Sequence, residues 1–249
     1  MHVVQRLSWW VTLMLVAAFT TVKTAMVSRF PINIRHNHKS AFRIFYQIGN
    51  SESDLPECTA MSVCNRVDTY STPWIERQCR CPGKKVCSMS IDAKDGYTVV
   101  DKSRQYKLCE PVNRLPTCRY FRDITWTYAT YPDNTTRQTM HCMCPKNSVA
   151  YIFKHESYNT PEGVAILYFL ACSPQSKMRC QRKEPCRLFT VKKRPDVEEV
   201  GTNTLCQCAR GHRCPQHHSE PSVISSPSSF TEEHIRTYSG YCTSELPTL

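Results

Sequence analysis

The chain lacks most features that mark an enzyme or a membrane protein. We find no serine elbow, HExxH pair, Gly-rich phosphate loop or Cys/His arrangement of the protease kind. Beyond the N-terminus, the most apolar run is Gly163 to Cys172, which is too short for the ~20 residues that cross a bilayer as a helix. Glycine is scarce and proline frequent (7 and 16 residues), so the turns should be largely proline-built. The sequence therefore predicts no enzyme activity, no cofactor and no membrane span.

Cysteine, by contrast, is abundant and regularly placed. A Cys-x-Cys pair occurs three times, each time at the same place in a longer pattern. The first and third units have six cysteines each and the second has four, which accounts for all 16. Because none is left over, we predict that all of them pair. In chain order the units hold Cys58, Cys64, Cys79, Cys81, Cys87 and Cys109; Cys118, Cys142, Cys144 and Cys172; and Cys180, Cys186, Cys206, Cys208, Cys214 and Cys242.

The N-terminus indicates the redox compartment in which these cysteines lie. Arg6 is followed by the apolar run Leu7 to Phe19 and then by small and polar residues to about Ala25. This charge, length and order are typical of a secretory signal peptide. We therefore predict a signal peptide over residues 1–25, an extracellular mature protein, and disulfides rather than thiols.

Zinc is the alternative for one cluster in the third unit. Its cysteines and histidines have a density typical of a metal site in a cytosolic protein. The first unit keeps the same cysteine positions without the histidines, so the pattern does not depend on them. We predict disulfides and no metal. The cluster consists of Cys206, Cys208, His212, Cys214, His217 and His218.

The second unit indicates part of the disulfide connectivity. It has Ile124 and Ala150 where its second and fifth cysteines should be. Losing both together is expected if those two cysteines bond to each other, since losing one would strand a thiol. For the other four cysteines, first-to-third with fourth-to-sixth and first-to-fourth with third-to-sixth both remain open. The predicted pairs are Cys64 with Cys87 and Cys186 with Cys214.

Strand-like runs predict a mostly β fold with little helix, arranged as small disulfide-rich modules in tandem. In a strand, residues two apart point to one face, so each Cys-x-Cys pair aims both sulfurs into one small core. After the signal peptide we expect a lead-in (26–53) and modules at 54–114, 115–176 and 177–249. The strand candidates are Phe42–Ile48, Thr125–Ala129, Val149–Phe153, Val164–Leu170 and Leu188–Val191.

Two pairs of neighbouring residues invite a catalytic interpretation. His141 precedes a Cys-x-Cys pair, but Gln78 and Leu205 stand at the same place in the other units. A position that varies among repeats is a poor candidate for a base. Glu198 and Glu199 lie in a polar stretch with no apolar pocket predicted nearby. Neither pair changes the prediction that the chain binds rather than catalyses.

The net charge is +11, with basic residues concentrated between Lys177 and Arg194. Outside the cell such a surface meets heparan sulfate or acidic partners rather than nucleic acid; the alternative is simply a solvated face. Asn134-Thr135-Thr136 is the only Asn-x-Ser/Thr sequon, and we predict a glycan on Asn134 in a loop of the second unit.

Several segments resemble the Argos (giant-lens) family of arthropods. They are DLPEC (54–58), TPWIERQCRCP (72–82), DKSRQYKLCEPV (101–112), CRYFRDITWT (118–127), CPKNSVAY (144–151), ACSPQSKMRCQRKEPCRLFTV (171–191) and TYSGYC (237–242). The resemblance extends from Leu55 to Cys242. It implies three-finger-like modules and a secreted antagonist of epidermal growth factor (EGF) receptor signalling, which clamps an EGF-like growth factor and keeps it from the receptor.

Aromatic residues and arginines supply most interface energy, and they give the candidate contacts with that ligand. For each aromatic residue the alternative is core packing; Phe153, Tyr168 and Phe169 are further candidates. The other functions considered are a secreted signal or toxin-like effector that acts directly on a receptor or channel, and a matrix protein held by heparan sulfate. The leading binding candidates are Trp74, Phe121, Trp126, Arg182, Lys183 and Arg187.

Overall fold

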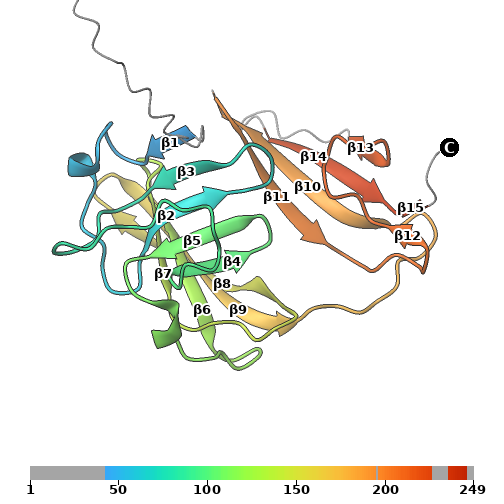
Figure 1. Cartoon of the computed structure of the whole chain (residues 1–249), viewed down its shortest axis with the longest axis horizontal. Coiled ribbons are helices and arrows are strands. Elements are labelled where there is room, and N and C mark those ends of the chain that lie inside the picture. Colours follow the sequence, from blue (N-terminus) through green and yellow to red (C-terminus); the bar gives the residue numbers. More distant parts are fainter. Residues whose placement is uncertain (1–42, 195, 226–234, 246–249) are drawn as a thin grey trace, which may run out of the picture. The chain divides into compact units, whose positions relative to one another are not determined.

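The computed structural model describes residues 43–194, 196–225 and 235–245 (Figure 1). These residues all belong to one unit of the chain, residues 41–249. The predicted signal peptide lies outside the described residues. Within them the fold is mostly β, as predicted; the helical pieces are two 3₁₀ turns, η1 (Glu52–Asp54) and η2 (Val112–Arg114). The strands are β1 (Arg43–Tyr46), β2 (Val63–Asp68), β3 (Trp74–Arg77), β4 (Thr98–Asp101), β5 (Arg104–Leu108), β6 (Ile124–Thr130), β7 (Thr136–Met140), β8 (Ser148–Thr160), β9 (Gly163–Pro174), β10 (Pro185–Lys193), β11 (Glu198–Thr204), β12 (His212–Arg213), β13 (Val223–Ser225), β14 (Ile235–Tyr241) and β15 (Thr243–Ser244).

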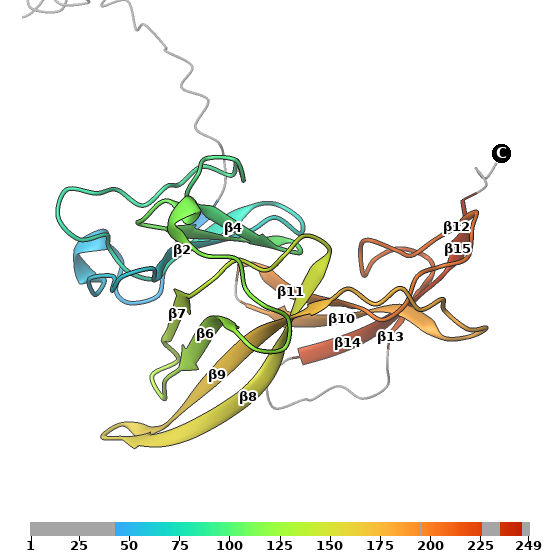
Figure 2. The same cartoon turned by 90° about the horizontal axis from the view of Figure 1, so that it is seen from below.

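The cysteine repeat is also a repeat of topology. Each unit forms an antiparallel sheet with the same strand order: β3-β2-β5-β4, β7-β6-β9-β8 and β11-β10-β14-β13. We call these the first, second and third modules. In the second module the last two strands lengthen into the long β8–β9 hairpin (Figure 2).

The predicted lead-in, residues 26–53, contains a strand that belongs to the first sheet. The strand expected around Phe42–Ile48 is present as β1, but it pairs in parallel with β3 and so extends the first sheet. A boundary at residue 53 would separate β1 from the sheet to which it belongs. Cysteine spacing could not show this, because β1 precedes the first cysteine.

The eight disulfides follow one pattern in all three modules. Cys64 bonds to Cys87 and Cys186 to Cys214, the two pairs that the sequence predicted. For the other four cysteines, the structure has the first bonded to the third and the fourth to the sixth. Each Cys-x-Cys pair lies just after a strand (β3, β7 or β11), not on it as the sequence suggested, and is bonded to two different segments. The remaining pairs are Cys58–Cys79, Cys81–Cys109, Cys118–Cys142, Cys144–Cys172, Cys180–Cys206 and Cys208–Cys242.

The second module replaces its missing disulfide with a hydrogen bond. A shift in strand register occurs at Cys64, at Thr125 and at Cys186. Thr125 is thus the structural counterpart of Cys64 and Cys186, whereas the spacing suggested Ile124. The second module reaches this register shift one residue later. Thr125 is buried, and its hydroxyl donates to the carbonyl of Cys142 over 2.8 Å.

This replacement predicts the effect of copying it into the first module. The double variant Cys64→Thr with Cys87→Ala should fold and lose about 2 kcal/mol, since a disulfide contributes ~2–4 kcal/mol and the new hydrogen bond recovers about 1 kcal/mol. Denaturant unfolding measures the difference. Cys87→Ala alone is the comparison: it leaves a free thiol and should be secreted less well than the double variant. Equal secretion of the two would contradict the account.

Adjacent modules share apolar cores. Val63, Tyr106 and Leu108 of the first module pack with Trp126 and Met140 of the second. The backbone N–H of Met140 donates to the carbonyl of Met61 over 3.0 Å. A small module that has lost one crosslink is therefore stabilised by its neighbour.

Candidate functional site

Five charged side chains from the first and third modules form an ion cluster. Arg66 on β2 contacts Glu76 on β3 over 2.9 Å and Glu199 on β11 over 2.8 Å. Arg194, just after β10, contacts the same two carboxylates over 3.0 and 2.6 Å. Arg104 on β5 approaches Glu199 over 3.4 Å. Both carboxylates are thus shared between the modules.

Arg66 and Glu76 are buried, the other three side chains are partly buried, and the charges of the cluster depend on one another. Burial opposes the charge on Arg66, but Glu76 and Glu199 outweigh it and raise the pKa of the guanidinium. Burial also opposes ionisation of Glu199, but Arg66, Arg194 and Arg104 lower the pKa of that carboxyl to about 2. Removing either carboxylate would leave the buried guanidinium of Arg66 with one ion-pair partner instead of two, and breaking a buried pair costs ~3–5 kcal/mol.

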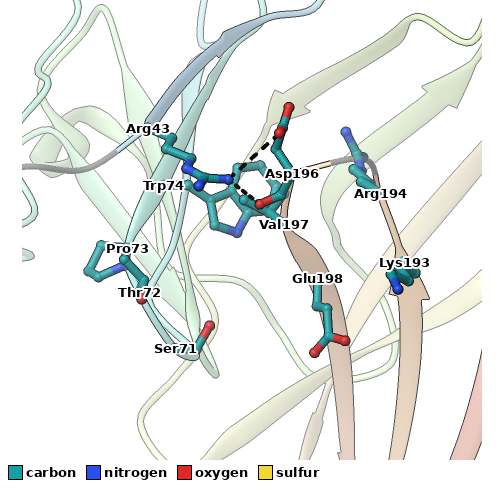
Figure 3. Close-up of a pocket in the computed structure, with 10 residues that line it drawn as sticks. All are labelled: Arg43, Ser71, Thr72, Pro73, Trp74, Lys193, Arg194, Asp196, Val197 and Glu198. Atoms are coloured by element: carbon teal, nitrogen blue, oxygen red, sulfur yellow. Dashed lines mark hydrogen bonds and ion pairs between the residues drawn. The ribbon is translucent and has the colours of Figure 1, made fainter.

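The ring of Trp74 packs against two arginines of the ion cluster. This ring is 5.4 Å from the guanidinium carbon of Arg66 and 5.7 Å from that of Arg194, and the edge of Phe45 packs against it. A cavity of about 370 Å³ beside Trp74 is bounded by Arg43, which donates to the carbonyl of Asp196 and pairs with its carboxylate (Figure 3). Two arginines from different modules therefore rest on a single buried indole.

A second link between these modules is built on Tyr70, in the β2–β3 loop. Its hydroxyl accepts a hydrogen bond from the backbone N–H of His218 over 2.7 Å, and the two rings stack. The ring of His217 packs against Tyr70 as well. In the Cys/His cluster for which zinc was the alternative, Cys206, Cys208 and Cys214 are all in disulfides. These two histidines therefore serve packing between modules.

Two adjoining cavities, about 860 and 470 Å³, open around the ion cluster, and we call them together the cleft. The first module contributes Tyr46 and Asp101, the second Tyr168 and the third Thr190 and Lys192. The cleft is thus lined by all three modules. The residues that line both cavities are Arg66, Arg104, Tyr128, Thr130 and Glu199.

One wall of the cleft is aromatic. Trp126, Tyr128 and Thr130 alternate along β6 and point to one face. The rings of Tyr128 and Tyr168 are 6.0 Å apart and both are half-buried. Ile152 on the edge strand β8 is 58% exposed beside them. Apolar rings beside arginine and carboxylate groups form a surface suited to binding a protein.

The six binding residues predicted from sequence do not form one site. Trp74 and Trp126 are 2% and 7% exposed, so both belong mainly to the cores, although Trp126 also lines the smaller cavity of the cleft; their role in binding stays a prediction. Phe121 is exposed and lies among Tyr120 and Tyr151, outside the lining of the cleft.

The three basic candidates lie in the third module, and none lines the cleft. Arg182 and Lys183 are exposed. Arg187 is half-buried and donates to the carbonyl of Pro215 over 2.9 Å. Burial lowers the pKa of Arg187.

Sequence analysis missed most of the residues that form the cleft. Arg66 and Arg104 are scattered single arginines, and only the pairing of β2 with β5 brings them to the same carboxylate. Glu199 was set aside as part of a polar stretch, whereas it lies at the centre of the ion cluster. The alternation of Tyr128 with Trp126 on a predicted strand was the one signal that could have indicated the aromatic wall. Tyr168 was among the wider candidates.

Asn134, the predicted glycosylation site, lies on the rim of the cleft. It occupies the turn between β6 and β7, is exposed, and lines the larger cavity. We expect Asn134 to carry an N-linked glycan, so that treatment with an amidase specific for these glycans converts it to Asp and removes one glycan mass. Intact-mass spectrometry before and after treatment measures this, with Asn134→Gln as the unglycosylated control. An unchanged mass would show that the site is empty.

The comparisons with known proteins agree with this architecture. A family model described as "Antagonist of EGFR signalling, Argos" matches residues 97–223. Protein giant-lens of Drosophila melanogaster is 35% identical over an alignment that covers 80% of this chain and 71% of the relative. The chain belongs to the Argos family. This is an extracellular, non-enzymatic family of signalling antagonists.

Two further comparisons are with a solved structure and with a toxin. A crystal structure of unliganded Argos is 51% identical to this chain and has a TM-score of 0.53, covering 82% of this chain and 99% of the other. U-scoloptoxin(11)-Sm5a of Scolopendra morsitans is 25% identical, covering 70% of this chain and 82% of the toxin. In the described ranges of our chain, no helix has the length and apolar character needed to cross a bilayer.

Proposed function

We propose that this protein is a secreted antagonist that binds an EGF-like growth factor in the cleft and keeps it from its receptor. The single observation that carries the proposal is that three disulfide-bonded modules line one cleft, in a chain of the Argos family. The ligand would contact an aromatic wall from the second module and charged groups from the first and third.

Stiffness supports this function. Eight disulfides, the shared apolar cores and the buried ion cluster restrict motion before any ligand arrives. A binding surface that is already ordered loses little conformational entropy when it binds, and this raises affinity for a given contact area.

The test is a binding measurement with purified components. The mature chain should form a one-to-one complex with a purified EGF-like growth factor domain in size-exclusion chromatography and calorimetry. Adding the chain should prevent the growth factor from binding receptor-bearing cells, while the chain alone should not bind those cells. Absence of a complex with any EGF-like domain of the same animal would overturn the proposal.

The similarity to scoloptoxins favours one alternative, a secreted effector that acts directly on a receptor or channel. The same cell assay separates the two functions. Saturable binding of the chain to cells in the absence of growth factor, with a response of those cells, would support the effector and contradict sequestration.

A further inference from the structure

One end of the third module gathers basic residues that are distant in the sequence. The segment that precedes β10 runs parallel to the Cys206-Gln207-Cys208 segment. Gln207 donates its backbone N–H to the carbonyl of Met178 over 2.8 Å, and Cys180 donates to the carbonyl of Gln207 over 3.0 Å. Arg179 donates from its guanidinium to the carbonyl of Cys208 over 2.7 Å. Because Arg210 follows Cys208 by two residues, these contacts bring its segment close to the basic residues around position 180.

Five basic side chains at this end of the third module are exposed, and within the described residues no ion pair neutralises their charge. None of them has an ion-pair partner among residues 43–194, 196–225 and 235–245, whereas Arg194 and Arg213 of the same module are paired. One carboxylate, that of Glu184, lies nearby; it accepts a hydrogen bond from the backbone N–H of Gln181 over 2.8 Å, and its single charge leaves the five cations in excess. We call this surface the basic end; its members are Lys177, Arg179, Arg182, Lys183 and Arg210.

The basic end differs from the basic run that the sequence indicated. In the structure Arg187 and Arg194 bind groups within the fold. Lys192 and Lys193 lie at the far end of β10, where they pair with Glu199 and Glu198 of β11. In their place Arg210 joins from a distant segment. The strand β10 therefore separates the run into an exposed basic end and residues that serve contacts between modules.

We propose that the basic end binds a sulfated polysaccharide chain of the extracellular matrix. Sulfates repeated along a flexible polymer need several exposed cations that can reorient, and no concave pocket. Binding would release condensed counterions, as it does for other polyanions, so that affinity falls steeply with salt. None of the five residues lines the cleft, so a growth factor and a polysaccharide could be held at the same time. This inference does not depend on the proposed antagonist function.

Chromatography on immobilised heparin tests the proposal with the full mature chain. The variant combines Lys177→Glu, Arg182→Glu and Arg210→Glu, whose side chains make no hydrogen bond or ion pair in the described part of the chain. The control combines Lys84→Glu, Lys94→Glu and Lys146→Glu, which are exposed in the other modules. Three reversals of two units each lower the net charge by six in both proteins, so the two variants have the same total charge.

The wild type should bind heparin at physiological ionic strength and elute with added salt. The basic-end variant should bind at least about tenfold more weakly, from the loss of three exposed ionic contacts, and the control should elute close to the wild type. Soluble heparin should displace the wild type, and hyaluronan, which has carboxylates but no sulfates, should not. The proposal fails if the wild type is not retained, if both variants weaken equally, or if hyaluronan competes as well as heparin. Unchanged denaturant midpoints establish that both variants are folded.

Discussion

Replacing Glu199 by glutamine should destabilise the protein by about 3 kcal/mol, because Arg66 would remain charged and buried with only Glu76 to balance it. The side chain of Glu199 is 14% exposed and touches arginines of both modules. Glutamine has the same size as glutamate and keeps one acceptor oxygen, so the loss of stability measures the effect of the charge and not of the side-chain volume. Chemical denaturation of the purified variant, with disulfides intact, measures it.

Glu198 provides the matched control. It is the neighbouring residue, carries the same charge, and its side chain is 51% exposed. Glu198→Gln should change stability by less than about 0.5 kcal/mol. Equal effects of the two substitutions would show that the ion cluster contributes nothing beyond surface charge.

The contribution of the ion cluster to stability should decrease as the pH is lowered. The pKa of Glu199 is lowered from 4.5 to about 2, so its contribution is fully present above pH 4.5 and is lost as pH falls towards 2. The wild type should therefore lose more stability than Glu199→Gln between these values, and the two curves should converge near pH 2. Parallel curves would contradict the assigned role of Glu199.

Alanine at Tyr128 or Tyr168 should weaken growth factor binding by roughly 30-fold or more, the effect of removing an aromatic hot spot. Both rings are half-buried in the wall of the cleft and face solvent on one side. Truncation removes contact area from the binding surface while leaving the strands of the second sheet paired. Calorimetry with the growth factor domain measures the dissociation constant.

Phe121→Ala is the control, and it also tests a competing hypothesis. Phe121 is 57% exposed and was a binding candidate from sequence, but it lies outside the cleft. Its truncation should change affinity less than about threefold. A large loss at Phe121 together with wild-type affinity at Tyr128 and Tyr168 would move the binding site to the outer face of the second module.

Spacing of cysteines was enough to predict the repeat and two disulfides, and strand-like runs were enough to predict the mostly β fold. It could not choose between the two patterns at each Cys-x-Cys pair, since alternation along a strand aims both sulfurs into one core in either case. It also misaligned the second module by one residue, because the segment from the first cysteine to the register shift is one residue longer there than in the first module. Thr125 therefore became visible as a substitute for cysteine only through its hydrogen bond.

The cleft was less predictable than the fold. Trp74 and Trp126 attracted attention because large aromatic residues often bind partners, but small modules also need such residues as cores. Glu199 illustrates the opposite error: a carboxylate in a polar segment becomes buried when residues more than a hundred positions away supply the arginines, as Arg66 does. Long-range charge pairing of this kind leaves no local pattern in a single sequence.

Thr136 has two roles: it belongs to a glycosylation sequon, and it contacts the segment after β1. It is the hydroxyl residue of the Asn134 sequon, which the glycan-transferring enzyme requires. In the folded chain its backbone N–H and its hydroxyl both donate to the side-chain carbonyl of Gln47, over 2.9 and 2.7 Å, just after β1. A sugar on Asn134 must then be attached before β1 docks. The order in which the N-terminal strand and the second module come together would set the glycan occupancy of the secreted molecule.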